Sequence, residues 1–170
     1  MEKENKNAVG KNDVLIRYSI AAPRELVFKA WTDPSLLPLW YAPDGCIVEF
    51  KTLDIRTGGG YHACIYNPEF GECWSKGVYK EIIAPERIVY SSIIADEEGN
   101  SISAIAAEMD PDWPQETLVT VSFAEEDGKT IVTLHQTVDT SLAKKTGAHP
   151  SWLKMLGRLD RLVVLRENTF

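Results

Sequence analysis

The chain has 170 residues, of which 44% are hydrophobic and 25% charged, and its formal net charge is -7. This composition is typical of a globular domain that buries one hydrophobic core without disulfides or metals. The negative charge repels phosphate backbones, so we expect no nucleic-acid partner. Neither a signal-peptide pattern nor a run of about 18 apolar residues is present, so we expect no membrane association and a cytoplasmic location.

The predicted elements begin with a polar lead, residues 1–12, which we expect to be flexible. A single domain is expected over residues 13–170. Its first strand is predicted by the alternation of Val14, Ile16 and Tyr18 with polar or small neighbours.

Two short helices and six more strands are expected next. Pro23 suits the first turn of a helix, and Asp33 can cap a second short helix. Runs rich in Val, Ile, Thr and aromatic residues, broken by turn residues, then predict an antiparallel meander. The expected strands are 46–54, 59–67, 73–83, 86–96, 116–125 and 129–138. The last two form the clearest hairpin, with Asp127-Gly128 at the turn.

The end of the chain predicts a long helix that covers the sheet. Residues 97–115, rich in turn residues, are expected to form a connection over an opening. Beyond Pro150, apolar residues recur at the spacing of one helix face, at Trp152, Met155, Leu156, Leu159, Leu162 and Val163. The fold class is therefore α+β, of the helix-grip type. We expect a curved antiparallel sheet of about seven strands, wrapped around a C-terminal helix of roughly five turns.

Several short motifs resemble those of one protein family. They are Ala22-Pro23, residues 28–34 (FKAWTDP), Leu39-Trp40, residues 54–59 (DIRTGG), 74–82 (WSKGVYKEI), 85–90 (PERIVY), 96–100 (DEEGN), 113–116 (WPQE), 127–130 (DGKT) and 151–153 (SWL). Over residues 14–166 the chain resembles the Hsp90-ATPase-activator-homologue-like family of the START and Bet v 1 superfamily. The resemblance implies the helix-grip fold. It leaves the function open, because this superfamily includes lipid carriers, hormone receptors, aromatase/cyclases and a chaperone regulator.

Aromatic side chains with polar tips are the candidate cavity residues, because they can line an apolar pocket and also orient a ligand. With two positions of the last helix, they are Trp40, Tyr61, Trp74, Tyr79, Tyr90, Trp152, Met155 and Leu159. Core packing is the alternative for each of them. In strand 73–83, Lys76 is expected to face outward, and Gly77 and Tyr79 inward. Gly157 is expected to widen the space or to allow close packing.

Histidines and cysteines predict no catalytic or metal site. The six residues are His62, His135, His149, Cys46, Cys64 and Cys73, and none of them has metal-ligand or CxxC spacing. We expect reduced cysteines buried in strands, and a His135 side chain that faces solvent. No catalytic residue, metal ligand or cofactor is therefore assigned.

Three functions remain as hypotheses. The first is binding of a hydrophobic small molecule, aromatic or lipid-like, in an internal cavity. The second is a cavity enzyme of the cyclase or hydrolase type. The third, implied by the resemblance, is interaction with a chaperone ATPase. A monomer and a homodimer are both compatible with the sequence.

Overall fold

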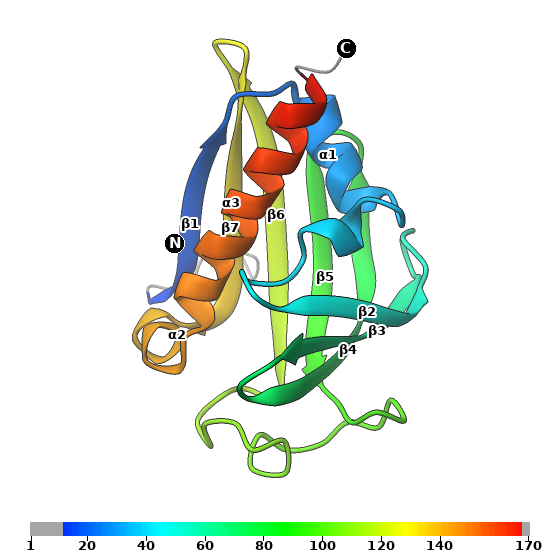
Figure 1. Cartoon of the computed structure of the whole chain (residues 1–170), viewed down its shortest axis with the longest axis vertical. Helices are drawn as coiled ribbons and strands as arrows, with labels where there is room; N and C mark the ends of the chain where they lie inside the picture. The colour runs from blue at the N-terminus through cyan, green and yellow to red at the C-terminus, as the bar shows by residue number, and fades with distance from the viewer. Residues whose placement is uncertain (1–11, 168–170) are drawn as a thin grey trace, which may run out of the picture.

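The computed structural model describes residues 12–167, so most of the predicted flexible lead, residues 1–12, lies outside the described part of the chain. Within that part, seven strands, three α-helices and one 3-10 helix follow one another as Figure 1 shows. The strands are β1 (Asp13–Ile20), β2 (Ile47–Leu53), β3 (Gly60–Asn67), β4 (Gly71–Ile83), β5 (Arg87–Ile94), β6 (Glu116–Glu126) and β7 (Lys129–Asp139). The helices are α1 (Arg24–Thr32), η1 (Leu37–Leu39), α2 (Thr140–Thr146) and α3 (Ala148–Glu167).

The strands form one antiparallel sheet in the order β1-β7-β6-β5-β4-β3-β2. The first strand pairs with the last, and β1 and β2 lie at the two edges. The β6–β7 hairpin turns at Asp127-Gly128 as predicted, and both residues have the positive φ angles, 54° and 77°, that a type I′ turn requires. Each of the six strands predicted after the first is present, with ends that differ by at most two residues.

Helix α3 covers the concave face of the sheet (Figure 1). Its buried residues are Trp152, Met155, Leu156, Leu159 and Val163, while the predicted Leu162 is only partly buried. Near the C-terminal end of α3, helix α1 adds Val27 and Trp31 to the core. The predicted helix-grip α+β fold is confirmed.

Two helices differ from the sequence-based expectation. The second short helix is the single 3-10 turn η1, preceded by Asp33, whose carboxylate accepts a hydrogen bond from the backbone N–H of Ser35. Helix α2 was not predicted. It is capped by the Asp139 carboxylate, which accepts from the Leu142 N–H, and it ends at Gly147 in the left-handed conformation. These two signals are readable in the sequence, but the helix has only seven residues and little apolar periodicity.

Across residues 12–167, no helix combines the length and the apolar character that a membrane span requires.

Candidate ligand-binding site

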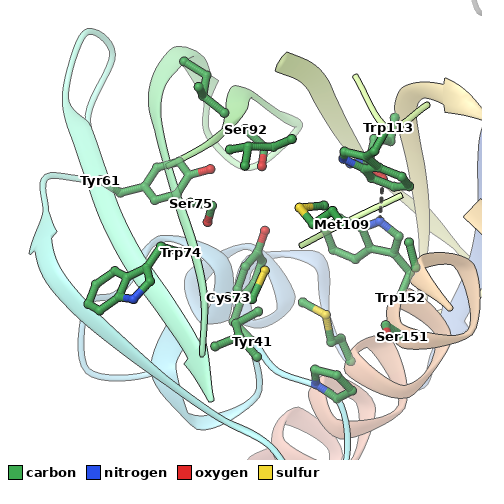
Figure 2. A pocket seen from close by; sticks show the side chains of 17 residues that line it. Tyr41, Tyr61, Cys73, Trp74, Ser75, Ser92, Met109, Trp113, Ser151 and Trp152 are labelled. Atoms are coloured by element: carbon green, nitrogen blue, oxygen red, sulfur yellow. Dashed lines mark hydrogen bonds between the residues drawn. The ribbon is translucent and has the colours of Figure 1, made fainter. Parts of the chain in front are cut away.

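A cavity of about 300 Å³ lies between the inner face of β3, β4 and β5 and the N-terminal half of α3 (Figure 2). The loop after η1 and the connection 95–115 complete its wall. This volume is at the lower end of the range of small-molecule sites, roughly 300–1,000 Å³. The predicted space between sheet and helix is therefore present at one end of the sheet.

Large apolar side chains form one side of the cavity. Trp152 projects from α3, and Met109 and Trp113 come from the connection 95–115 (Figure 2). Met155 of α3 also lines the cavity. Two indole rings and two flexible thioethers provide an apolar, polarisable surface that adapts to planar ligands. This side of the cavity suits an aromatic or alicyclic body.

Polar contacts hold the connection that carries Met109 and Trp113. At its start, Lys51 donates to the Glu97 carbonyl at 2.7 Å, and Lys76 donates to the Gly99 carbonyl at 2.7 Å. The His62 Nε2 lies 2.9 Å from the Asp96 carbonyl oxygen and donates to it. Further along, the Asp110 carboxylate pairs with Lys145 of α2 at 3.2 Å. The connection is thus tied both to the outer face of the sheet and to α2.

Arg158 of α3 holds the loop on the other side of the cavity. Its guanidinium donates to the backbone carbonyls of Leu39, at 3.1 Å, and Ala42, at 2.5 Å. This loop contributes Tyr41 and Pro43 to the cavity wall. The helix therefore supplies lining residues itself and also positions a neighbouring part of the wall.

A cluster of three hydroxyl groups, from Tyr61, Ser75 and Ser92, forms the sheet side of the cavity (Figure 2). The Tyr61 hydroxyl donates to the Ser91 carbonyl oxygen at 3.0 Å. Burial raises the pKa of Tyr61 to about 12, against the opposing effect of hydrogen bonds from Ser92 and Ser75. Tyr61 is therefore neutral at physiological pH, and the cluster is polar without being charged.

Gly77 allows this cluster to form. A Cβ atom at this position would lie 1.8 Å from the Ser91 carbonyl oxygen and 2.7 Å from Cε1 of Tyr61. Only a glycine lets the Tyr61 ring lie across β4 and reach the Ser91 carbonyl. Gly77 and Tyr79 are buried and Lys76 is partly exposed, in agreement with the predicted alternation of β4.

A second polar group, Gln136 of β7, lies on the opposite wall. Its Oε1 accepts from the Trp152 indole N–H at 2.9 Å, and its Nε2 donates to the Thr117 hydroxyl at 3.0 Å. Gln136 is buried, so these bonds compensate for its loss of hydration. They also fix the orientation of Trp152, which borders the cavity.

Four tyrosines continue from the cavity into the core. Tyr41 and Tyr61 line both the cavity and a smaller gap of about 10 Å³, which Tyr79 and Tyr90 also line. The hydroxyl groups of Tyr41 and Tyr90 are hydrogen-bonded to each other. Burial raises the pKa of Tyr79, and it raises the pKa values of Tyr41 and Tyr90 well above their ordinary range. All four therefore stay neutral at physiological pH.

Formal charge is missing from the cavity wall. None of its 17 lining residues, all in the described part of the chain, is an Asp, Glu, Lys, Arg or His. The same residues 12–167 contain no group of three or more His, Cys, Asp or Glu side chains placed to hold a metal ion. The cavity can therefore offer a ligand apolar contact and neutral hydrogen bonds.

Comparison with protein families identifies the chain. The family model described as activator of Hsp90 ATPase homolog 1-like protein matches residues 21–164. The chain belongs to this family. The resemblance deduced from its motifs is thus confirmed, and the match includes every element from α1 to most of α3. No match is found among curated protein sequences.

Solved structures share the fold of this family member at low sequence identity. A protein from Staphylococcus epidermidis is 24% identical, with a TM-score of 0.74 and 95% of each chain covered. One from Chromobacterium violaceum is 22% identical, with a TM-score of 0.71, 89% of this chain and 96% of the other covered. The AHSA1 protein from Silicibacter pomeroyi is 17% identical, with a TM-score of 0.70, 91% of this chain and 99% of the other covered. At such identities the likeness concerns the fold.

The structure distributes the eight candidate residues over three environments. The cavity is lined by Tyr61, Trp74, Trp152 and Met155. The small gap next to it is lined by Tyr79, Tyr90 and also Tyr61. The other two residues, Trp40 and Leu159, line neither space and are fully buried in the core. The role of these residues in binding a ligand stays a prediction.

Trp74 has an unusual place among these residues, because its backbone borders the cavity while its indole points away from it (Figure 2). The ring packs 5.0 Å from the His62 ring and lies beneath the Lys51 ammonium, also at 5.0 Å. Trp74 is two residues from Lys76, so strand alternation places both on the outer face of the sheet.

The histidines and cysteines differ from expectation in two cases. His135 lies on the opposite face from Leu134, as the alternation predicts, but it does not face solvent, because its Nε2 is 2.8 Å from the Asp13 carboxylate of the neighbouring β1. Cys73 was expected to be buried and is exposed, because it lies near the start of β4, beside the cavity. Cys46 and Cys64 are buried free thiols, as predicted.

Sequence reasoning missed several lining residues, including Tyr41, Ser75, Ser92, Trp113 and Gln136. Gln136 had a readable signal, because it continues the inward-facing series of Val132 and Leu134 and is therefore a polar residue at a core position. Trp113 lies in a connection without regular structure, so no periodicity could place it.

Proposed function

We propose that the chain binds a hydrophobic small molecule, aromatic or lipid-like, in the cavity beneath α3. The observation that carries this proposal is the lining itself. Indole and thioether groups face a cluster of neutral hydroxyls across about 300 Å³ of space. Apolar walls with a few convergent polar groups are typical of small-molecule sites.

The electrostatics of the cavity favour binding over catalysis. General acid–base catalysis needs a group whose pKa lies near the working pH. The ionisable side chains at the cavity include Tyr41 and Tyr61, and burial raises the pKa of each. A cyclase or hydrolase reaction would have to proceed without a general base among the lining residues whose pKa lies near the working pH.

The proposal can be tested by ligand-induced thermal stabilisation. The panel contains fatty acids, sterols, flavonoid-like polyphenols and aromatic polyketides, because selective binding to the folded state raises its melting temperature. We expect a saturable rise for one chemical class. A Met155→Trp variant, which fills the cavity from α3, should lose this rise. The matched control is Leu153→Trp, on the exposed side of the same helix, which should keep it.

A folded protein whose melting temperature responds to no member of the panel would contradict the proposal. The same holds if Met155→Trp and Leu153→Trp respond equally to a ligand that stabilises the unmodified chain. If Met155→Trp does not fold, Ser151→Phe provides a second way to fill the cavity, from the first turn of α3.

Protein binding is the second candidate function, because apolar side chains are exposed around a groove beside the cavity. Phe70 is 84% exposed and Ile105 is 71% exposed. Phe70 lines this groove of about 640 Å³, together with Met109. The family description points to an Hsp90-type ATPase as the partner. A changed ATP hydrolysis rate on adding the chain, abolished in Phe70→Ser, would support this candidate.

A further inference from the structure

The ligand proposed above can be specified more closely from the hydrogen-bonding state of the cavity wall, and this step rests on the proposed function. Tyr61 gives its single hydroxyl proton to the Ser91 carbonyl oxygen. Its oxygen can then only accept, and the neighbouring hydroxyls of Ser75 and Ser92 are the groups at this wall that can donate to it. When both serines donate to Tyr61, the lone pairs of their oxygens remain for a ligand. This wall therefore presents hydrogen-bond acceptors.

An anionic ligand would lose its hydration in this cavity without gaining a partner. A buried carboxylate needs a cation or several hydrogen-bond donors to offset desolvation. The cationic side chains near the cavity are already engaged elsewhere. Lys51 and Lys76 donate to carbonyls on the outer face of the sheet, and Arg158 donates to the carbonyls of the Leu39–Ala42 loop. A cationic ligand would find no carboxylate to neutralise its charge, because none of the described lining residues is an Asp or Glu.

We infer that the cavity selects an uncharged ligand that carries a hydroxyl group, with this hydroxyl donating to Ser75 and Ser92. The body of the ligand packs against the apolar side of the cavity, formed by the rings of Trp113 and Trp152 and the thioethers of Met109 and Met155. Phenols and alicyclic alcohols have this chemistry. Fatty acids and other carboxylates do not, so the inference divides the ligand panel into two classes.

Three probes of one size test the inference: naphthalene, 2-naphthol and 2-naphthoate, measured by calorimetric titration at pH 7. They share the apolar body and differ only in having no polar group, a neutral donor or a charge. We expect 2-naphthol to bind at least about a hundredfold more tightly than 2-naphthoate at pH 7, because a carboxyl group with a pKa near 4 is protonated in only about one molecule in a thousand at this pH. We also expect it to bind several-fold more tightly than naphthalene.

The pH dependence gives an independent readout. If only the protonated acid enters the cavity, the apparent affinity for 2-naphthoate falls about tenfold for each pH unit from pH 6 to pH 8, because the protonated fraction falls tenfold. The affinity for 2-naphthol should stay constant over this range, because no lining residue changes its charge there. An affinity for 2-naphthoate that does not depend on pH would overturn the inference.

Variants connect the selectivity to the two serines. The double change Ser75→Ala and Ser92→Ala should reduce the affinity for 2-naphthol to that for naphthalene, and leave naphthalene binding unchanged. Ser122→Ala, which removes a hydroxyl from the opposite face of the sheet, should change neither. Where the double variant does not fold, each single variant should lose part of the preference.

The outcomes separate this inference from the proposed function. Equal binding of naphthalene and 2-naphthol, or of 2-naphthol and 2-naphthoate, would leave a binding cavity but overturn the assignment of a neutral hydroxyl ligand. Retained preference for 2-naphthol in the double serine variant would overturn it as well. If the folded protein binds none of the three probes and nothing in the wider panel, the proposed function fails and the inference fails with it.

Discussion

The two ends of α3 face interiors of different kinds. Toward its C-terminus, Leu156, Leu159 and Val163 have no exposed surface and pack into a continuous apolar core. Toward its N-terminus, Trp152 and Met155 border a cavity of about 300 Å³. One helix and one sheet therefore produce both a packed end and a hollow end.

Side-chain size and an extra covering element account for the difference. At the packed end, α1 and the Trp40 side chain fill the space, and apolar residues such as Val121 and Phe123 occupy the inner face of β6. At the hollow end, the inner face of the sheet carries Ser75 and Ser92, and irregular chain replaces a helix as the cover. The same sheet and the same helix α3 run through both ends. The cavity therefore results from small side chains on the sheet and from a cover that has no regular secondary structure.

The largest expected effect comes from removing a packed aromatic. Trp40 is fully buried, its ring lies 4.7 Å from that of Trp31, and its indole donates to the Ala30 carbonyl at 3.0 Å. We expect Trp40→Ala to lower the free energy of unfolding by about 3–5 kcal/mol, measured by urea denaturation. The matched change at the hollow end, Trp113→Ala, should cost about 1 kcal/mol or less. Similar losses for both variants would show that the two ends are packed alike.

Alkaline pH should destabilise the tyrosine cluster between the two ends. Burial raises the pKa of Tyr61 from 10.0 to about 12, so the folded state holds the phenolic proton more tightly than the unfolded state. The associated stability, about 3 kcal/mol, is present below pH 10 and is lost as pH rises toward 12. Tyr41 and Tyr90, whose pKa values burial also raises, add to this loss.

Urea denaturation at several pH values from 8 to 12 measures this effect. In Tyr61→Phe the slope of unfolding free energy against pH should be shallower, because one of the buried phenols is gone. At pH 8 this variant should already lose about 1 kcal/mol, because the hydrogen bond to the Ser91 carbonyl is missing. A pH slope equal to that of the unmodified chain would indicate that Tyr61 is not protected by burial.

Gly77 provides a test of the hollow end alone. The Cβ atom of Gly77→Ala would overlap the Ser91 carbonyl oxygen, so β4 and β5 must separate or the Tyr61 ring must move. We expect a loss of about 1–3 kcal/mol in unfolding free energy. Ligand binding should weaken as well, because the hydroxyl cluster with Ser75 and Ser92 is disturbed. Unchanged ligand affinity in a folded Gly77→Ala protein would show that the hydroxyl cluster does not contribute to ligand binding.

The packed end and the sheet were largely predictable from the sequence. Alternation in strands such as β6 and β7 and the apolar spacing in α3 are local patterns, and each identifies a buried face without knowledge of its partner. The family motifs added the order of the elements. These patterns do not indicate how much empty volume remains between the buried face of the sheet and the buried face of α3.

The cavity wall was therefore predicted only in part. Tyr61, Trp152 and Met155 were predicted to line the cavity because large side chains at inward-facing positions are easy to recognise in a sequence. Ser75 and Ser92 were missed because a small polar residue in a strand normally indicates a solvent-exposed face. Trp40 was chosen for its ring and proved to be core, since the sequence does not indicate that Trp31 and Tyr41 enclose it.

The smallest expected effect, and the one of opposite sign, concerns Gly157 in the middle of α3. A Cβ atom there would meet the Arg161 guanidinium at 3.6 Å and the Tyr18 hydroxyl at 3.8 Å, which are ordinary contact distances away from the cavity. Gly157→Ala should therefore raise the unfolding free energy by about 0.5–1 kcal/mol through helix propensity, and leave ligand affinity unchanged. Changed affinity in this variant would mean that the hollow end depends on the flexibility of α3 as well as on small side chains at its wall.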